Sequence, residues 1–295
     1  MSQDPTAMPK WLRDVQQLLG IRAQFILTGN IRDDVFLGAP DRLESLMEAL
    51  WQALQPLGYA GLLVWDRVDG LRAYPPEPAR QQALSSIGGQ DLVRAQPMGL
   101  ESLAGVVRRV SVPADRQSPR VALVVDFASR LRGENQTSDD ARNFFVAAEK
   151  AALEARPVAR RNADGTAGSL LFNPVIWLSN RGPDLPHWLT VDNERIRSIP
   201  IPLPLGDMRY RVALNLWPRL TSKDEVAVET FAREFAMLTD NMSFTAMQDI
   251  VALANRQDLG ASDIKQAVQS FRVGDTSLKS PWRGAQLRTR ISDAE

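Results

Sequence analysis

The sequence predicts an α/β protein in which helices cover both faces of a parallel sheet and a small all-α region follows. Two observations support this fold class. Up to about residue 205, short apolar runs that end in glycine or polar residues alternate with longer amphipathic stretches, as strands and helices do in parallel α/β folds. Beyond Gly206 the apolar residues recur at helical spacing alone.

Five apolar runs predict the strands, and amphipathic stretches predict the helices. The expected strands are residues 23–28, 61–66, 120–126, 173–180 and 195–202, and Pro200 and Pro202 favour a sheet edge for the last one. In the first part of the chain we expect helices at residues 9–19, 41–54 and 138–155, and a weaker helical pattern at 84–110. The later helices are expected at residues 207–216, 223–238, 243–256 and 262–271, with Ser243 and Ser262 as N-caps.

Two stretches predict loops, the first at the edge of the core and the second exposed. Residues 66–80 contain Pro75, Pro76 and Pro78, which exclude a regular helix or a central strand. Residues 156–168 are polar and contain glycine and a basic cluster.

These patterns divide the chain into four parts. We expect an N-terminal helix in residues 1–22, an α/β domain in 23–205 and a helical domain in 206–273. Residues 274–295 are expected to form a linker or the start of a further helix, because Ser280 suits an N-cap and Pro281 the first helical position. A chain that stops soon afterwards fits a fragment of a longer polypeptide, or equally a frayed tail.

Composition excludes several classes of function. Hydrophobic residues make up 44% of the 295 residues and charged residues 24%, as in ordinary globular proteins. Lys+Arg and Asp+Glu are both 35, so no global field attracts nucleic acid or an anionic membrane. Because cysteine is absent and His187 is the only histidine, disulfides, cysteine-ligated zinc, serine-protease triads and two-histidine metal sites are not expected. We predict no resident metal site from the composition.

The localisation expected from the sequence is cytoplasmic. Met1–Pro5 lacks the basic and apolar parts of a signal peptide, and no apolar run approaches the roughly 20 residues of a membrane span.

Polar residues at strand ends carry the functional information. Asp126 ends the clearest strand, Asn180 ends the next one, and the first strand runs into Gly29-Asn30-Ile31-Arg32-Asp33. This order of parts resembles the AAA+ superfamily over residues 23–271. The resemblance implies a P-loop-NTPase-like core with a helical lid. It also implies that Asp126 corresponds to the Walker B aspartate, which helps hold magnesium, and Asn180 to a sensor that orients the attacking water.

The resemblance extends to two arginines. Residues 192–197, which lead into the last strand, are similar to the segment that carries a trans-acting arginine, and Arg195 is the best match for this interface residue. Arg272 lies near the position of a second sensor arginine in the lid. The cofactor that the resemblance implies is ATP or ADP with magnesium, bound through Asp126, Asn180 and Arg272.

The sequence departs from the family where catalysis requires specific residues. A Walker A loop needs a glycine-rich turn and a lysine that reaches the phosphates, but the five lysines of the chain follow no core strand in such a turn. Phe127 stands where the family has its catalytic glutamate. Positioning and charge stabilisation supply nearly all phosphoryl-transfer catalysis. Asp126 and Asn180 are therefore vestigial catalytic candidates, and we do not expect the chain to hydrolyse ATP alone.

Each candidate residue has a structural alternative. Asp126 could simply cap the loop after its strand, and Asn180 could support a turn. Arg195 could be a solvated arginine beside Asp192 or Glu194. The basic cluster at residues 156–161 could grip a polymer inside a ring or be a solvated turn.

The leading hypothesis is a non-hydrolysing AAA+-like module that acts in assembly, partner recruitment or regulation of an active ATPase. Its expected partners are another AAA+ module or ring subunits, and it resembles the degenerate first module of two-module AAA+ proteins. Alternatively, the chain is a nucleotide-dependent remodelling ATPase whose phosphate loop comes from a partner or from a missing part of the polypeptide. A third class, a nucleic-acid-binding adaptor, is disfavoured by the balanced charge.

Overall fold

The computed structural model describes residues 8–38, 41–89, 97–116, 118–132, 138–161, 167–191 and 193–274. It separates into two compact units. The first, here called the α/β unit, comprises Met1–Ala39 and Leu43–Pro202, and the second, the helical unit, comprises Leu203–Glu295 and Pro40–Arg42. Each unit is described by itself below.

A six-stranded sheet forms the centre of the α/β unit, in the order β10, β1, β9, β6, β4, β5. The first five strands run parallel, and β5 is antiparallel to β4. The predicted parallel sheet is therefore confirmed, and β10 lies at its edge, as the prolines indicate. The strands are β1 (Gln24–Gly29), β4 (Gly61–Asp66), β5 (Gly70–Tyr74), β6 (Val121–Val125), β9 (Val175–Ser179) and β10 (Ile196–Ile201).

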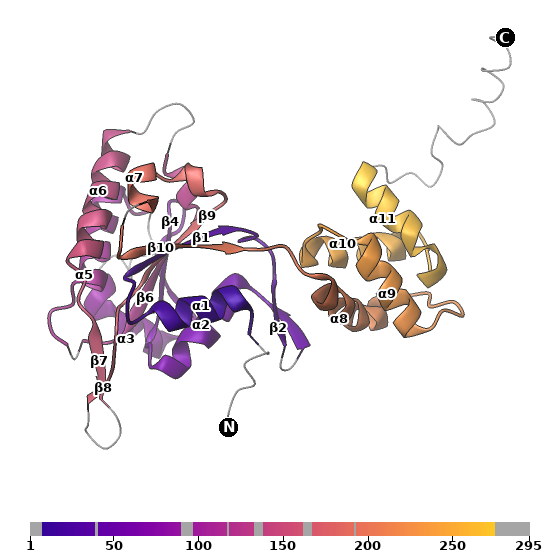
Figure 1. Cartoon of the computed structure of the whole chain (residues 1–295), viewed down its shortest axis with the longest axis horizontal. Coiled ribbons are helices and arrows are strands. Elements are labelled where there is room, and N and C mark those ends of the chain that lie inside the picture. Colours follow the sequence, from indigo (N-terminus) through magenta and orange to yellow (C-terminus); the bar gives the residue numbers. More distant parts are fainter. Residues whose placement is uncertain are drawn as a thin grey trace, which may run out of the picture. The chain divides into compact units, whose positions relative to one another are not determined.

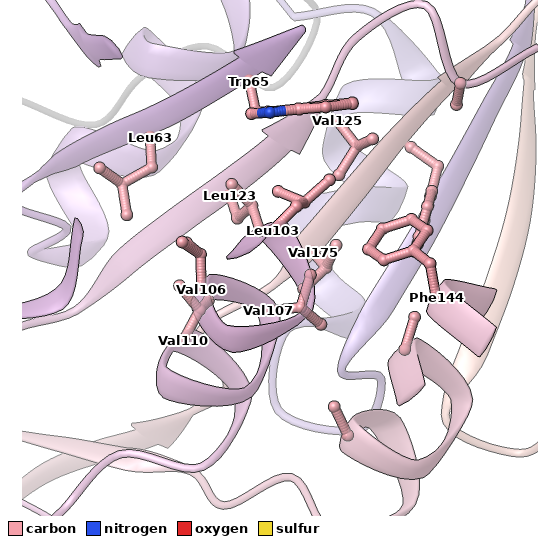
Figure 2. Close-up of a cluster of buried hydrophobic side chains, with 14 of the residues drawn as sticks. Leu63, Trp65, Leu103, Val106, Val107, Val110, Leu123, Val125, Phe144 and Val175 are labelled. Atoms are coloured by element: carbon pink, nitrogen blue, oxygen red, sulfur yellow. The ribbon is translucent and has the colours of Figure 1, made fainter. Parts of the chain in front are cut away.

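Helices cover both faces of the sheet, because successive side chains of its buried strands point to opposite sides. In β4, Leu63 and Trp65 belong to one hydrophobic cluster and Leu62 and Val64 to the other. Helices α5 (Leu100–Ser111) and α6 (Asp139–Leu153) pack on the first face, and α1 (Lys10–Leu18) and α2 (Leu46–Leu54) on the second (Figure 1). Figure 2 shows the first cluster, where Leu103 and Val107 of α5 lie beneath the strands. The three-layer α/β architecture is thus confirmed.

Local signals in the sequence explain where several helices begin and end. Ser45 and Ser138 accept hydrogen bonds from the backbone N–H groups of Glu48 and Ala141, so they cap α2 and α6. The described part of the weak helical pattern at residues 84–110 belongs to α3 (Pro78–Gly88) and α5. The described residues of the α/β unit also include α7 (His187–Thr190) and the 3-10 turns η1 (Gln55–Leu57), η2 (Ala128–Arg130) and η3 (Gly182–Asp184).

Five short strands, β2, β3, β5, β7 and β8, were not among the predicted elements. Asp41–Glu44, expected to be helical, forms β3, which pairs with β2 (Val35–Gly38), and α2 begins only after Ser45. The predicted loop at residues 66–80 contains β5, which is possible because the prolines come only after its last residue, Tyr74. The polar stretch after α6 forms a hairpin of β7 (Val158–Arg161) and β8 (Ala167–Leu171) instead of an open loop.

Among its described residues, the helical unit contains the α-helices α8 (Gly206–Leu216), α9 (Val228–Leu238), α10 (Phe244–Arg256) and α11 (Ile264–Val273). The same residues include the 3-10 turns η4 (Trp217–Arg219) and η5 (Ala261–Asp263). Ser243 caps α10 as predicted. Helix α9 begins later than expected, because Asp224 has a φ of 47°, in the left-handed region that a helix excludes. Ser262 does not cap α11: its hydroxyl donates to Asp224 Oδ2 at 2.8 Å. The Ser280–Trp282 helix start lies outside the described residues.

Candidate functional site

The candidate site lies at the carboxyl edge of the sheet, where β1, β9 and β6 end side by side. In parallel α/β sheets this edge is where ligands bind. The strands deliver the turn after Gly29, the pair Asp126 and Phe127, and Asn180 to the same edge.

Gly29 shapes the turn after β1. Its φ of 90° lies in the region that favours glycine, and an added Cβ would meet the carbonyl oxygen of Ile201 at 2.7 Å. The next N–H, of Asn30, donates to the same oxygen at 3.0 Å. The Asn30 amide also donates to Asp33 Oδ2 at 2.9 Å. Because Ile31 is buried in the core, the turn presents Arg32 outward.

Arg32 reaches across the edge to Asp126. Its Nη2 lies 2.7 Å from Asp126 Oδ1, and its guanidinium lies 3.9 Å from the centroid of the Phe127 ring. The Asp126 side chain is 11% exposed and the Arg32 side chain 43% exposed. The same Oδ1 accepts the N–H of Phe127 at 2.7 Å. This carboxylate is therefore held by a cation and a backbone N–H.

Phe127 adopts an unusual backbone conformation that brings its ring against the Arg32 guanidinium. Its φ is 51°, in the left-handed region, and its side chain is 50% exposed. A bulky residue rarely has a positive φ, and such outliers cluster at ligand sites and switches. The conformation places the ring beneath the guanidinium, where a cation–π contact contributes roughly 0.5–1 kcal/mol at an exposed site.

Asn180 is fixed at this edge through its backbone. Its N–H donates to Ser129 Oγ at 2.7 Å, and its carbonyl oxygen accepts the N–H of Gly29 at 3.1 Å. Ser179 Oγ donates to the carbonyl oxygen of Arg181 at 2.8 Å, so in its 3.0 Å pair with Ser129 it is the acceptor. The hydroxyls of Ser129 and Ser179 thus join the ends of β6 and β9 and position Asn180.

The two arginines selected by resemblance lie elsewhere. Arg195 immediately precedes β10 and therefore lies at the amino ends of the parallel strands, away from the candidate site. Its guanidinium lies 5.3 Å from the Phe172 ring centroid. Its Nη1 is 3.5 Å from the carbonyl oxygen of Ile21. Arg272, in the last turn of α11, donates to the carbonyl oxygen of Leu238 at 2.8 Å within the helical unit. Neither contact tests a role across an interface or in a lid.

Sequence reasoning did not select Arg32 as a site residue. The signal was present, because Arg32 is the basic residue of the Gly29–Asp33 turn at the end of a core strand. What the sequence did not provide was the strand order that brings this turn to the same edge as Asp126.

Asp66 ends the neighbouring strand β4 but has a structural role. Its Oδ1 accepts the N–H groups of Val68 and Asp69, and its Oδ2 accepts Arg72 Nη1 at 2.6 Å. Burial alone would raise the pKa of Asp66, but the hydrogen bonds from Asp69, Arg72 and Val68 lower it below its ordinary value. This carboxylate therefore stays charged and closes the β4–β5 turn.

A hollow of about 700 Å³ lies beside the end of β4. Trp65 and Phe144 contribute apolar surface to it, whereas Arg67, Glu101 and Asp140 bring charge. None of its lining residues belongs to the Arg32–Asp126 cluster.

Within the described residues, no group of three or more His, Cys, Asp or Glu side chains is arranged to hold a metal ion. The helices in those same ranges are all too short or too polar to cross a membrane.

Comparison with known proteins identifies the family. A family model described as the AAA+ chaperone N-terminal Rossmann-like domain matches residues 2–202. The chain belongs to this family. The AAA+ assignment made from the strand ends is thereby confirmed, and the match spans most of the α/β unit.

Two solved structures are similar to this AAA+ chain. The FIGL-1 AAA domain has 12% identity and a TM-score of 0.47, with 89% of this chain and 80% of that chain covered. The FIGL-1 AAA domain in complex with ADP has 12% identity and a TM-score of 0.45, with 98% of this chain and 88% of that chain covered. No curated protein matches the sequence.

The residues present do not fit the nucleotide and magnesium that the AAA+ fold implies. Mg²⁺ is bound through carboxylates and nucleotide phosphates, but Asp126 is paired with Arg32. A lysine would have to reach the phosphates from the turn after β1, and that turn contains none. No catalytic step through bound nucleotide follows from this geometry.

Proposed function

We propose that this chain is a non-hydrolysing AAA+-like module that acts in assembly, partner recruitment or regulation of an active ATPase. The observation that carries the proposal is the ion pair of Arg32 with Asp126, which neutralises the carboxylate that the family resemblance assigns to Walker B. The missing phosphate-binding lysine and the phenylalanine at position 127 support it independently.

The ion pair matters for electrostatics more than for folding. Because Arg32 is 43% exposed, solvent screens the pair, and such pairs contribute about 1 kcal/mol or less. A single fully buried leucine contributes roughly 1.5–3 kcal/mol. The fold therefore does not depend on the pair. Its consequence is local: a magnesium–nucleotide complex would have to displace a guanidinium that already lies against Asp126 and Phe127.

The test is equilibrium binding and turnover of ATP and ADP with magnesium by the purified chain, beside a measurement of its assembly state. We expect no turnover and no binding up to about millimolar nucleotide, because nearly all phosphoryl-transfer catalysis comes from positioning and charge that this site lacks. ATP turnover that an Asp126→Ala change abolishes would overturn the proposal.

The remodelling-ATPase alternative has its own outcome in the same experiment. If ring assemblies form and trap nucleotide between chains, and if an Arg195→Ala change releases it, a phosphate loop from a partner becomes the better account. The Arg32→Ala variant is the control for the ion pair, since it frees Asp126 without touching the backbone of the site.

A further inference from the structure

A basic hollow lies apart from the Arg32–Asp126 pair. It has a volume of about 250 Å³ and is lined by Arg132, Arg142, Pro186, His187 and Trp188. Three segments supply these residues: the one after η2, the first turns of α6, and the start of α7.

The two arginines of the basic hollow carry charge that no described side chain neutralises through an ion pair. In the described ranges, neither guanidinium forms an ion pair, whereas Arg72, Arg181 and Arg209 each do. Arg132 has one long hydrogen bond, 3.5 Å from its Nη1 to the carbonyl oxygen of Pro183. The described lining contains no carboxylate. The basic hollow is therefore an attractive site for negative charge.

The position of Arg142 supports this interpretation. It lies near the start of α6, which begins at Asp139, and the positive end of the helix dipole disfavours a cation there. Asp139 and Asp140 of the first turn suit this end of the helix, but among the described residues the Arg142 side chain has no hydrogen bond or ion pair. An anionic ligand would supply that compensation.

Trp188 adds an apolar contact surface beside the charge. Its side chain is 42% exposed, although burying an indole is strongly favourable, and Pro186 is buried next to it in the chain. Tryptophan and arginine are the residue types most enriched among those that dominate protein–protein binding energy. His187 contributes imidazole hydrogen-bonding groups to the same rim.

We propose that the basic hollow binds an acidic peptide segment of a partner protein. Carboxylates of the segment pair with Arg132 and Arg142, and an apolar side chain packs on Trp188. Charge complementarity selects the sign of the ligand. The volume of about 250 Å³ suits one or two side chains. The chain has 35 basic and 35 acidic residues, so no net positive charge attracts a nucleic-acid backbone.

This inference rests on the recruitment role proposed above and gives its partner a chemistry. It uses no residue of the Arg32–Asp126 site. ATP turnover would therefore overturn the proposed function without affecting peptide binding, and a failure of peptide binding would leave the nucleotide result unchanged.

The experiment measures fluorescence anisotropy of a labelled peptide of glutamates around one leucine, titrated with the full chain. A matched peptide with glutamine for glutamate and an oligothymidylate of equal charge are the comparison probes. We expect the acidic peptide alone to bind, and Arg132→Glu and Arg142→Glu each to weaken its binding by about tenfold. Trp188→Ala removes the apolar contact and should weaken it by about fivefold. Arg142→Glu should fold, because an acid suits that end of α6.

Arg233→Glu is the matched control, since Arg233 is an exposed arginine of α9 and the charge change is identical. It should bind within about twofold of the unchanged protein, and circular dichroism should match for all variants. Equal binding by the Arg132→Glu and Arg142→Glu variants would overturn the proposal. So would tighter binding of the oligothymidylate than of the acidic peptide, which would make the basic hollow a nucleic-acid contact.

Discussion

At the scale of single residues, the backbone conformation of Gly29 determines where Arg32 lies. We expect Gly29→Ala to destabilise the protein by about 2 kcal/mol, because the new Cβ combines a left-handed φ with a 2.7 Å approach to the backbone oxygen of Ile201. Urea unfolding measures the change. Gly182→Ala is the matched control, since nothing lies within 4 Å of its added Cβ. Equal losses in both variants would show that the turn is not specific for glycine.

Asp66 gives a pH dependence whose sign follows from its lowered pKa. A group whose folded pKa lies below the unfolded value of about 3.8 stabilises the fold above that value and loses this contribution as pH falls through the folded pKa. The natural protein should therefore have a higher free energy of unfolding than Asp66→Asn. This difference should be largest near neutral pH and should shrink below about pH 3.8. Urea unfolding between about pH 3 and 6 measures it. A difference that stays constant over this range would contradict the prediction.

At the scale of elements, the sequence predicted the helices and strands that have a strong hydrophobic pattern, but it did not predict the pairing of short, polar strands. The buried strands β4, β6 and β9 were found because each is a continuous apolar run between layers of helices. The hairpin β7–β8 was missed because its strands are short and flank a polar, glycine-containing stretch. Likewise Asp126 and Asn180 were found as strand ends, whereas the Arg32 contact depends on strand order, which no local pattern encodes.

Arg120 fixes the missed hairpin to the body of the α/β unit. It is 4% exposed and donates to the carbonyl oxygens of Leu57 at 2.6 Å, Val158 at 3.2 Å, and Ser169. We expect Arg120→Met to destabilise the protein by about 2–3 kcal/mol, because buried carbonyl groups lose their donor. Hydrogen exchange should accelerate first in β7 and β8.

The control for this element is Arg116→Met, the same chemical change at a nearby exposed arginine. Its stability should remain within about 0.5 kcal/mol of the natural protein. If both arginines were equally dispensable, the hairpin would be held by its apolar contacts, such as the buried Val158, and not by the guanidinium.

At the scale of the whole molecule, the chain combines an α/β unit and a helical unit, each with a core of its own. Trp177 and Phe145 pack within the first unit with ring centroids 6.0 Å apart, and Phe231 and Phe235 stack in the second at 5.3 Å. Separate cores favour unfolding in more than one step. Two units that unfold independently suit a module whose proposed role is to hold partners instead of turning over nucleotide.

A pair of matched core substitutions tests this independence. Phe231→Ala and Phe145→Ala each remove a fully buried ring, which costs about 3–5 kcal/mol, one in each unit. If the units unfold separately, calorimetry will show two transitions, with Phe231→Ala lowering the midpoint of one and Phe145→Ala that of the other. A single transition that both variants lower equally would show instead that the two cores unfold as one cooperative structure, and that a partner bound to one unit stabilises the other by mass action.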